Sequence, residues 1–240
     1  MERQYRSLIL SDDWNIIQKA VKEGRHAVPC LPLRGVPKEG GNLSGFSYVL
    51  EDAENVEDAY LDLIDDRLCE RPHTVLETAR CLVREISLED LPELYRIYEE
   101  PEITAYMEPL YEDREKEEAY TRDYIKWHYG FYGFGMWIVT DKTGMILGRA
   151  GFEEKGDGIA ELGFMIRKQS QRQGYAYEVS KGLLTFFIRE YPEYRIRSMC
   201  HKDNTASVNL LTKLGFITER ENGKENGGEN PCIFWEYQVK

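Results

Sequence analysis

Basic residues gather at one point of the sequence, where they could bind a polyanion. Between residues 167 and 181 the chain carries four basic residues against a single acid, Glu178, although its formal net charge is −12. The basic residues are Arg167, Lys168, Arg172 and Lys181. A local excess of positive charge of this kind attracts anionic ligands such as phosphates.

The backbone of the same segment is suited to the close approach of a ligand. The letters QSQRQGYA join an expected strand, residues 158–166, to an expected helix, residues 175–190. The first amide groups of a helix lack internal partners and carry the positive end of the helix dipole, so they can hold phosphate oxygens. Gly174 and Ala176 present little obstruction. The segment predicts a pyrophosphate site; an ordinary strand–helix connection with solvated charges is the alternative.

Three segments together resemble the GCN5-related N-acetyltransferases (GNAT superfamily). QRQGYA is similar to that superfamily's Q/R-x-x-G-x-G/A signature, and NTASVNLLTKLGF is similar to its next block, N-x-x-S-x-x-x-L-x-K-x-G-F. ELGFMI resembles the fourth strand of the branch that acetylates the N-termini of ribosomal proteins. The resemblance covers residues 81–240, with the motifs in the expected order.

The resemblance implies an α/β (α+β) fold in which a mixed, mostly antiparallel sheet carries helices on both faces. It also implies an enzyme that moves the acetyl group of acetyl-CoA to a primary amine by direct attack in a ternary complex. The acceptor would be a protein N-terminus or a small cationic amine. A protein that binds acyl-CoA as a sensor, with little or no catalysis, is the alternative.

In this family the cofactor lies where the fourth and fifth strands splay apart. The backbone of Phe164, Met165 and Ile166 would then pair with the pantetheine arm. The turn would hold the pyrophosphate through its amides, and its residues are Gln171, Arg172, Gln173, Gly174, Tyr175 and Ala176. By the same resemblance, Lys168 and Arg172 would lie near the phosphates.

Two polar residues of the next block would lie beside the cofactor. Asn204 would bond the pantetheine arm or order the local loop, and it is also a good capping residue for the helix that follows. Ser207 would face the same side and could approach the sulfur; a partly buried helix serine is the alternative. Many family members have a tyrosine as general acid where this chain has Leu211. The thiolate would therefore be protonated by water or Ser207, or leave as the anion.

The attacking amine needs a base, and Glu161 on the expected fourth strand is the candidate. An alkylammonium has a pKa of about 10, so it must lose a proton before it attacks. A carboxyl group buried among apolar neighbours has a raised pKa, which suits this task. Strand alternation places Glu161, Gly163 and Met165 on one face of the strand. A solvent-facing glutamate is the alternative.

An acidic segment would border the acceptor. Residues 82–118 contain thirteen acidic and four basic residues, and in this superfamily the first two helices lie beside the acceptor site. A negative rim would attract a cationic amine; a solvated helical face is the alternative. Five residues are expected to line the acceptor pocket, or else to pack in the core: Tyr106, Met107, Phe131, Tyr132 and Phe134.

Hydrophobic periodicity and turn residues arrange these groups on a series of elements. From residue 81 the expected strands are 81–86, a hairpin over 135–152 that turns at 141–144, 158–166, 194–202, 215–220 and 232–239. The expected helices are 87–100, which Ser87 and Asp90 would cap, 114–129, 175–190 and 204–214.

The first 78 residues are interpreted as a small α/β domain of unknown role that precedes the acetyltransferase domain, residues 79–240. Its expected elements are strands 7–13, 26–31 and 46–52 and helices 14–24 and 56–70. Their order faintly resembles the closing half of a haloacid-dehalogenase-like domain. The DxDxT nucleophile motif is absent, so no phosphatase chemistry is assigned to Asp12 or Asp13. The domain would serve docking, dimerisation or substrate choice.

Composition argues against several other classes. A hydrophobic content of 42% and a charged content of 31% are typical of a soluble globular protein, and no apolar run reaches membrane-spanning length. The five cysteines are scattered, so neither a disulfide framework nor a metal site is expected, and the cytoplasm is the expected location. The net charge argues against nucleic acid or an anionic membrane as partner. The sequence does not decide between a monomer and a homodimer.

Overall fold

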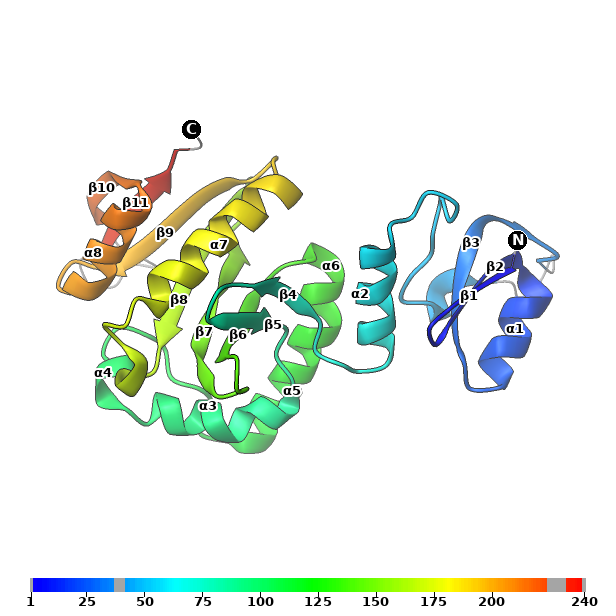
Figure 1. Ribbon diagram of the computed structural model, residues 1–240, viewed down its shortest axis with the longest axis horizontal. Helices are drawn as coiled ribbons and strands as arrows, with labels where there is room; N and C mark the ends of the chain where they lie inside the picture. Colours follow the sequence, from blue (N-terminus) through cyan, green and yellow to red (C-terminus); the bar gives the residue numbers. More distant parts are fainter. Residues whose placement is uncertain (1, 37–41, 224–231, 239–240) are drawn as a thin grey trace. The chain divides into compact units, whose positions relative to one another are not determined.

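The computed structural model of the protein describes residues 2–36, 42–223 and 232–238. It divides into two compact units, Met1–His73 and Thr74–Lys240 (Figure 1). The division lies a few residues before the expected boundary, because Thr74–Glu77 form strand β4, which pairs with β5 (Cys81–Arg84) in the larger unit. None of the helices in the described ranges is long and apolar enough to cross a membrane.

The first unit is built on a three-stranded sheet of order β1-β2-β3. Its elements are β1 (Glu2–Tyr5), β2 (Leu8–Asp13), α1 (Trp14–Lys22), β3 (His26–Arg34) and α2 (Asp58–Leu68). Strand β2 is antiparallel to β1 and parallel to β3, so α1 is the crossover between two parallel strands. Leu8 and Leu10 of β2 pack with Leu61 and Ile64 of α2 in one core.

Two expectations for this unit need comment. The strand expected at residues 46–52 is wrong: the segment makes a single bridge, Leu50 to Cys30, and the Phe46 ring packs edge-on against Trp14 instead. Asp12 pairs with Arg34 at 2.7 Å, and Asp13 caps α1 by accepting from an amide. These contacts give both acidic side chains structural roles.

The second unit is built on one eight-stranded sheet of order β10-β11-β9-β8-β7-β6-β5-β4. Its further strands are β6 (Met136–Asp141), β7 (Ile146–Glu154), β8 (Ile159–Ile166), β9 (Arg195–His201), β10 (Phe216–Gly223) and β11 (Cys232–Tyr237). Its helices are α3 (Leu91–Tyr98), α4 (Pro101–Thr104), α5 (Arg114–Asp123), α6 (Tyr129–Tyr132), α7 (Tyr175–Glu190) and α8 (Thr205–Leu214). All described pairs are antiparallel except β8 with β9.

Local sequence signals explain several of these elements. The hydroxyl and amide of Ser87 both donate to Asp90, which closes the expected capping box before α3. The β6–β7 turn is fixed by Asp141, whose carboxylate accepts from the amides of Thr143 and Met145. The helix expected at 114–129 is instead α5, a π-helical turn at Tyr124–His128 and α6. Part of the polar loop expected before β11 lies outside the described residues.

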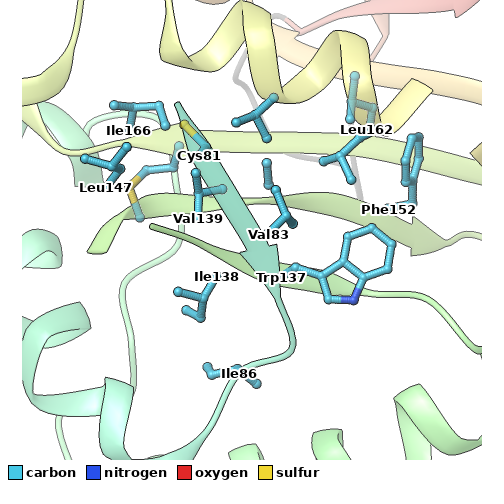
Figure 2. Packing of buried hydrophobic residues seen from close by; sticks show 14 of the residues in the cluster. Cys81, Val83, Ile86, Trp137, Ile138, Val139, Leu147, Phe152, Leu162 and Ile166 are labelled. Atoms are coloured by element: carbon cyan, nitrogen blue, oxygen red, sulfur yellow. The ribbon is translucent and has the colours of Figure 1, made fainter. Parts of the chain in front are cut away.

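The two faces of the sheet are covered by different helices, as expected for the fold class. Helix α7 contacts β7 and β8 from one face, where Phe152 stacks on Phe187 with ring centroids 3.9 Å apart. Figure 2 shows Phe152 and Leu162 on the side of α7, whereas Ile138 and Ile86 lie on the other side of the sheet. That other face is contacted by α3. The core on both faces is apolar and buried, so it holds the strands that carry the site in place.

Candidate functional site

Strands β8 and β9 separate part of the way along their length. They pair in parallel only from Ile159 to Glu161, and the last pair is Glu161 with Arg197. One residue further, the buried Ser198 hydroxyl donates to the Leu162 carbonyl at 2.8 Å. Because this bond comes from a side chain, it satisfies the carbonyl while the two backbones diverge. The result is the gap between strands that the resemblance implies.

The hydrogen bonds of β8 show which of its backbone groups face the gap. The carbonyls of Leu162 and Ile166 point away from β7, since they accept from Ser198 Oγ and, at 2.8 Å, from Gln171 Nε2. Backbone groups alternate in direction along a strand. The N–H and C=O of Phe164, midway between them, therefore face the gap and are placed to pair with an extended ligand.

A cavity of about 830 Å³ begins at this gap and continues to the turn before α7. It is lined by both strands, by the turn and by the first part of α8. Ten of the twelve predicted site residues line it: Phe164, Met165, Ile166, Gln171, Arg172, Gly174, Tyr175, Ala176, Asn204 and Ser207. The other two, Gln173 and Glu161, lie outside its lining.

The turn before α7 presents a row of backbone donors. Within the described ranges, no carbonyl or side chain accepts a hydrogen bond from any amide of residues 172–177. Gly174 has φ of +84° and Arg172 has φ of +60°, which turn the chain sharply into the helix. Consecutive amides in such a turn form a concave site for anions. The physical basis of the predicted pyrophosphate site is therefore present.

The nearby positive charges divide into two groups. Arg167 and Lys168 are held in ion pairs, with Glu93 at 2.9 Å and with Glu102 at 3.0 Å. Arg172, by contrast, lines the cavity, as does Lys213 of α8. Of the two residues expected near the phosphates, the structure brings Arg172 to the cavity and turns Lys168 toward an acid.

The sequence analysis did not predict that Arg80 binds the turn before α7. Arg80, between β4 and β5, donates to the Gln173 carbonyl at 3.0 Å and stacks over the Tyr175 ring at 4.3 Å. Its guanidinium also bonds Glu178 of α7 at 2.7 Å, and Glu178 accepts from Thr78. Burial opposes ionisation, but these hydrogen bonds lower the pKa of the Glu178 carboxyl. Long-range pairs of this kind leave no local sequence signal.

Asn204 and Ser207 meet through the backbone at the start of α8. The Asn204 carboxamide oxygen accepts from the Ser207 amide at 3.1 Å, so the asparagine caps the helix. Both residues still line the cavity. The Ser207 hydroxyl takes no part in the cap, which leaves it available to a ligand.

Leu211 and Cys200, on α8 and β9, are poorly suited to act as a general acid or a nucleophile. Leu211, at the position where the family tyrosine is expected, has no exposed surface and packs in the core. Cys200 lines the cavity, but burial raises the pKa of its thiol. A protonated thiol is a weak nucleophile, so Cys200 is poorly suited to attack a thioester.

Glu161 lies on the sheet face opposite α7, in the last pair before the strands separate. Its carboxylate is 3.4 Å from the Lys155 ammonium, and its side chain retains 21% of its exposure. Gly163, the next residue on that face, carries no side chain, and the Met136 thioether occupies the space above it, 3.2 Å from where a Cβ would lie. Glu161 is thus near the gap but already paired, and its role as base stays a prediction.

The expected acceptor residues fall into two groups. Tyr106 and Met107 line the cavity. Phe131, Tyr132 and Phe134 do not: Phe134 is fully buried against Phe187 of the core, Tyr132 packs on it, and Phe131 is 82% exposed. These three lie outside the cavity lining, and Tyr132 and Phe134 follow the alternative of core packing.

His201 is a cavity-lining residue that sequence reasoning missed. It ends β9, and its ring lies 5.4 Å from that of Tyr106. Its Nδ1 accepts from the Asp203 amide at 3.2 Å, so the proton of the neutral ring is on Nε2. In the described part of the chain, no cluster of three or more His, Cys, Asp or Glu side chains could hold a metal ion.

The fold is shared with solved acetyltransferases. RimL, a ribosomal L7/L12 alpha-N-protein acetyltransferase solved with coenzyme A, superposes with a TM-score of 0.60 at 16% identity, over 70% of this chain and 98% of RimL. A spermidine N-acetyltransferase SpeG chimera from Vibrio cholerae and hSSAT gives a TM-score of 0.56 at 19% identity, over 66% of this chain and 95% of the chimera. At these identities the likeness shows a shared fold.

A family model shows the family to which the chain belongs. The model of the acetyltransferase (GNAT) domain matches residues 80–217, more than half of the chain, and the chain belongs to that family. The uncharacterized N-acetyltransferase YjdG of Bacillus subtilis is 32% identical over 108 residues. This match covers 44% of the chain and 64% of YjdG, slightly less than two thirds of that protein.

Proposed function

We propose that this protein transfers the acetyl group of acetyl-CoA to a primary amine by direct attack in a ternary complex. One observation carries the proposal: a single cavity joins the gap between β8 and β9 to the unengaged amides of residues 172–177. An extended arm that ends in a diphosphate fits both halves of this arrangement. Coenzyme A has that shape.

The chain's own groups then have distinct tasks. The backbone of Phe164 holds the pantetheine arm as an added strand would, and the amides of residues 172–177 hold the diphosphate with Arg172. Asn204 and Ser207 border the arm from α8. Together they fix the thioester at the point where the strands part, beside Gly163. Such positioning is a large part of catalysis in bimolecular reactions.

The chemical step needs one proton acceptor and one place for negative charge. Glu161 takes a proton from the ammonium, directly or through a water, and the free amine attacks the thioester carbonyl. The C–N bond forms, the C–S bond breaks, the thiolate leaves, and the second proton of the amine nitrogen passes through water to that thiolate. A thiol with a pKa of about 8.5 is a tolerable leaving group near neutral pH, and the Ser207 hydroxyl can hydrogen-bond to it.

A cationic acceptor is supported by the acids around the cleft. Glu102 and Asp203 line the cavity, and residues 82–118 carry nine net negative charges, thirteen acids against four bases. A negative rim raises the local concentration of an ammonium ion. The relatives of shared fold act, by their names, on a protein α-amino group and on spermidine. Both kinds of amine are therefore the first acceptors to test.

One observation favours a second candidate, a protein that binds acyl-CoA without turnover. Leu211 is fully buried where many family members have a tyrosine acid. A side chain of that kind can support cofactor binding but cannot protonate a thiolate.

Thiol release from acetyl-CoA, measured over a panel of peptides, polyamines and amino acids, separates the two candidates. The proposal predicts amine-dependent release of free coenzyme A with at least one class of acceptor, and a product heavier by one acetyl group. Tight coenzyme A binding without release for every class would contradict it and favour the sensor.

A further inference from the structure

A short segment ties the two sides of the cofactor cavity together. Residues 100–107, here called the acceptor wall, include α4 and border the cavity. At one end, both carboxylate oxygens of Glu100 engage the turn before α7: one accepts from the Lys168 amide at 3.0 Å, the other from Gln169 Nε2 at 3.0 Å. Figure 1 shows α4 beside the start of α7.

The other end of the acceptor wall reaches the opposite side of the cavity. The Tyr106 hydroxyl donates to the Asp203 carbonyl at 3.5 Å, and its ring packs against His201. Ile103 and Met107 line the cavity between these two attachments. The wall is thus fixed to the phosphate turn at one end and to the β9–α8 loop at the other.

The charge of this contact is unexpected beside a site for a polyanion. A carboxylate close to phosphates repels them, yet Glu100 and Glu102 both lie at the turn. The Lys168 ammonium offsets part of this charge and lowers the pKa of the Glu102 carboxyl. Attraction of phosphate does not explain Glu100. Its two hydrogen bonds to residues 168 and 169 do, since they connect the turn to the wall.

We propose that Glu100 is a positioning residue that couples the phosphate turn to the acceptor wall, so that coenzyme A binding orders the wall on which the amine docks. The inference rests on the proposed function for the identity of the ligands. When the turn closes on a diphosphate, Lys168 and Gln169 are fixed, and Glu100 passes that restraint to Ile103 and Met107. Coupling of this kind is reciprocal, so a bound acceptor also raises the affinity for coenzyme A.

Hydrogen–deuterium exchange of residues 100–107, with and without coenzyme A, tests the coupling. Three proteins are compared: wild type, Glu100→Ala and Glu99→Gln. Glu99 is the exposed neighbour at the end of α3 and serves as the matched control. We expect coenzyme A to slow exchange in the wall about fivefold or more in wild type and in the control, and to leave it nearly unchanged in Glu100→Ala.

Calorimetry with coenzyme A on the same proteins separates coupling from simple damage. Because Glu100→Ala removes a negative charge beside the phosphate site, its affinity for coenzyme A should be equal to that of wild type or tighter. The KM for the acceptor should rise while coenzyme A binding holds. Full protection of the wall in Glu100→Ala, or coenzyme A binding weakened more than about tenfold (1.4 kcal/mol), would overturn the proposal.

The same data distinguish the failure of this inference from failure of the proposed function. Protection that depends on Glu100, without thiol release, would remove the enzyme but keep the coupling. Thiol release without any protection of the wall in wild type would keep the enzyme and remove the coupling. Absence of coenzyme A binding would overturn both.

Discussion

The Lys155 ammonium lies 3.4 Å from Oε1 of Glu161 and binds the candidate base before any substrate arrives. It also lies 3.1 Å from Glu153, which stands directly opposite Glu161 in the β7–β8 ladder. Burial opposes its charge, but the two carboxylates raise the pKa of Lys155. The acceptor's ammonium must therefore share or replace a cation that is already in place.

This pair gives a direct test of the base. Glu161→Gln should lower kcat about 100-fold or more, since general base catalysis contributes at least that much. Coenzyme A affinity should not change, because Glu161 lies outside the lining of the cavity. Glu153→Gln is the matched control: it removes the other carboxylate of the same ion pair, one strand further from the gap, and should keep most of the activity. Equal losses in both variants would point to the ion pair and not to a base.

Ser207→Ala tests the hydroxyl beside the sulfur. The variant keeps the backbone amide that Asn204 caps, so the start of α8 and the melting temperature should not change. If the hydroxyl hydrogen-bonds the leaving thiolate, kcat should fall about fivefold to tenfold, the value of one ordinary hydrogen bond of about 1 kcal/mol. Steady-state rates and a thermal melt decide this. An unchanged kcat would mean that water, and not the Ser207 hydroxyl, hydrogen-bonds to the leaving thiolate.

Gly174→Ala tests the geometry of the turn, with Gly215→Ala as its control. Both glycines have positive φ, +84° and +94°, and in both an added Cβ would meet no atom closer than 3.5 Å. Each variant should lose about 1–2 kcal/mol of stability from the same backbone strain. Only Gly174→Ala should also weaken the binding of coenzyme A, because only this substitution reorients amides of the proposed phosphate site. Similar coenzyme A affinities for the two variants would contradict this.

The hydrogen bonds of Glu178 should make part of the free energy of unfolding depend on pH. Its pKa in the folded protein is below the ordinary value of 4.5, so its contribution is complete above that value and is lost as the pH falls through the lower folded-state pKa. The difference in free energy of unfolding between wild type and Glu178→Gln, followed by thermal melts, should be largest at neutral pH, at about 1 kcal/mol for partly exposed charged hydrogen bonds, and should shrink below pH 4.5. A difference that grows in acid would contradict the assignment.

Much of the second unit could be predicted because its signals are local. The capping box at Ser87, the Asp141 turn and helix α7 follow from residue spacing alone. The cavity residues from Phe164 to Ala176 are also contiguous in sequence, so one motif locates most of the site. Where a single segment supplies both the turn and the ligand-facing backbone, sequence reasoning is sufficient.

The remaining features depend on contacts between distant residues. Arg80 and Glu178 are 98 positions apart, Glu100 and Lys168 are 68 apart, and neither pair has a sequence signature. The strand expected at residues 46–52 is wrong: Phe46, one of its two aromatic residues, packs on Trp14. Phe134 looked like a pocket residue, but its ring sits among Phe187, Tyr191 and Tyr194. Composition cannot tell a buried aromatic from one that lines a cleft.

The central claim is that the unengaged amides of residues 172–177 hold the diphosphate of coenzyme A. Isothermal titration calorimetry with coenzyme A and with pantetheine, which shares the arm but lacks the diphosphate and the adenosine beyond it, tests it most directly. The account predicts one coenzyme A site per chain, with pantetheine weaker by about 100-fold or more, about 2.7 kcal/mol. Equal affinity for the two ligands, or no binding of coenzyme A, would contradict it.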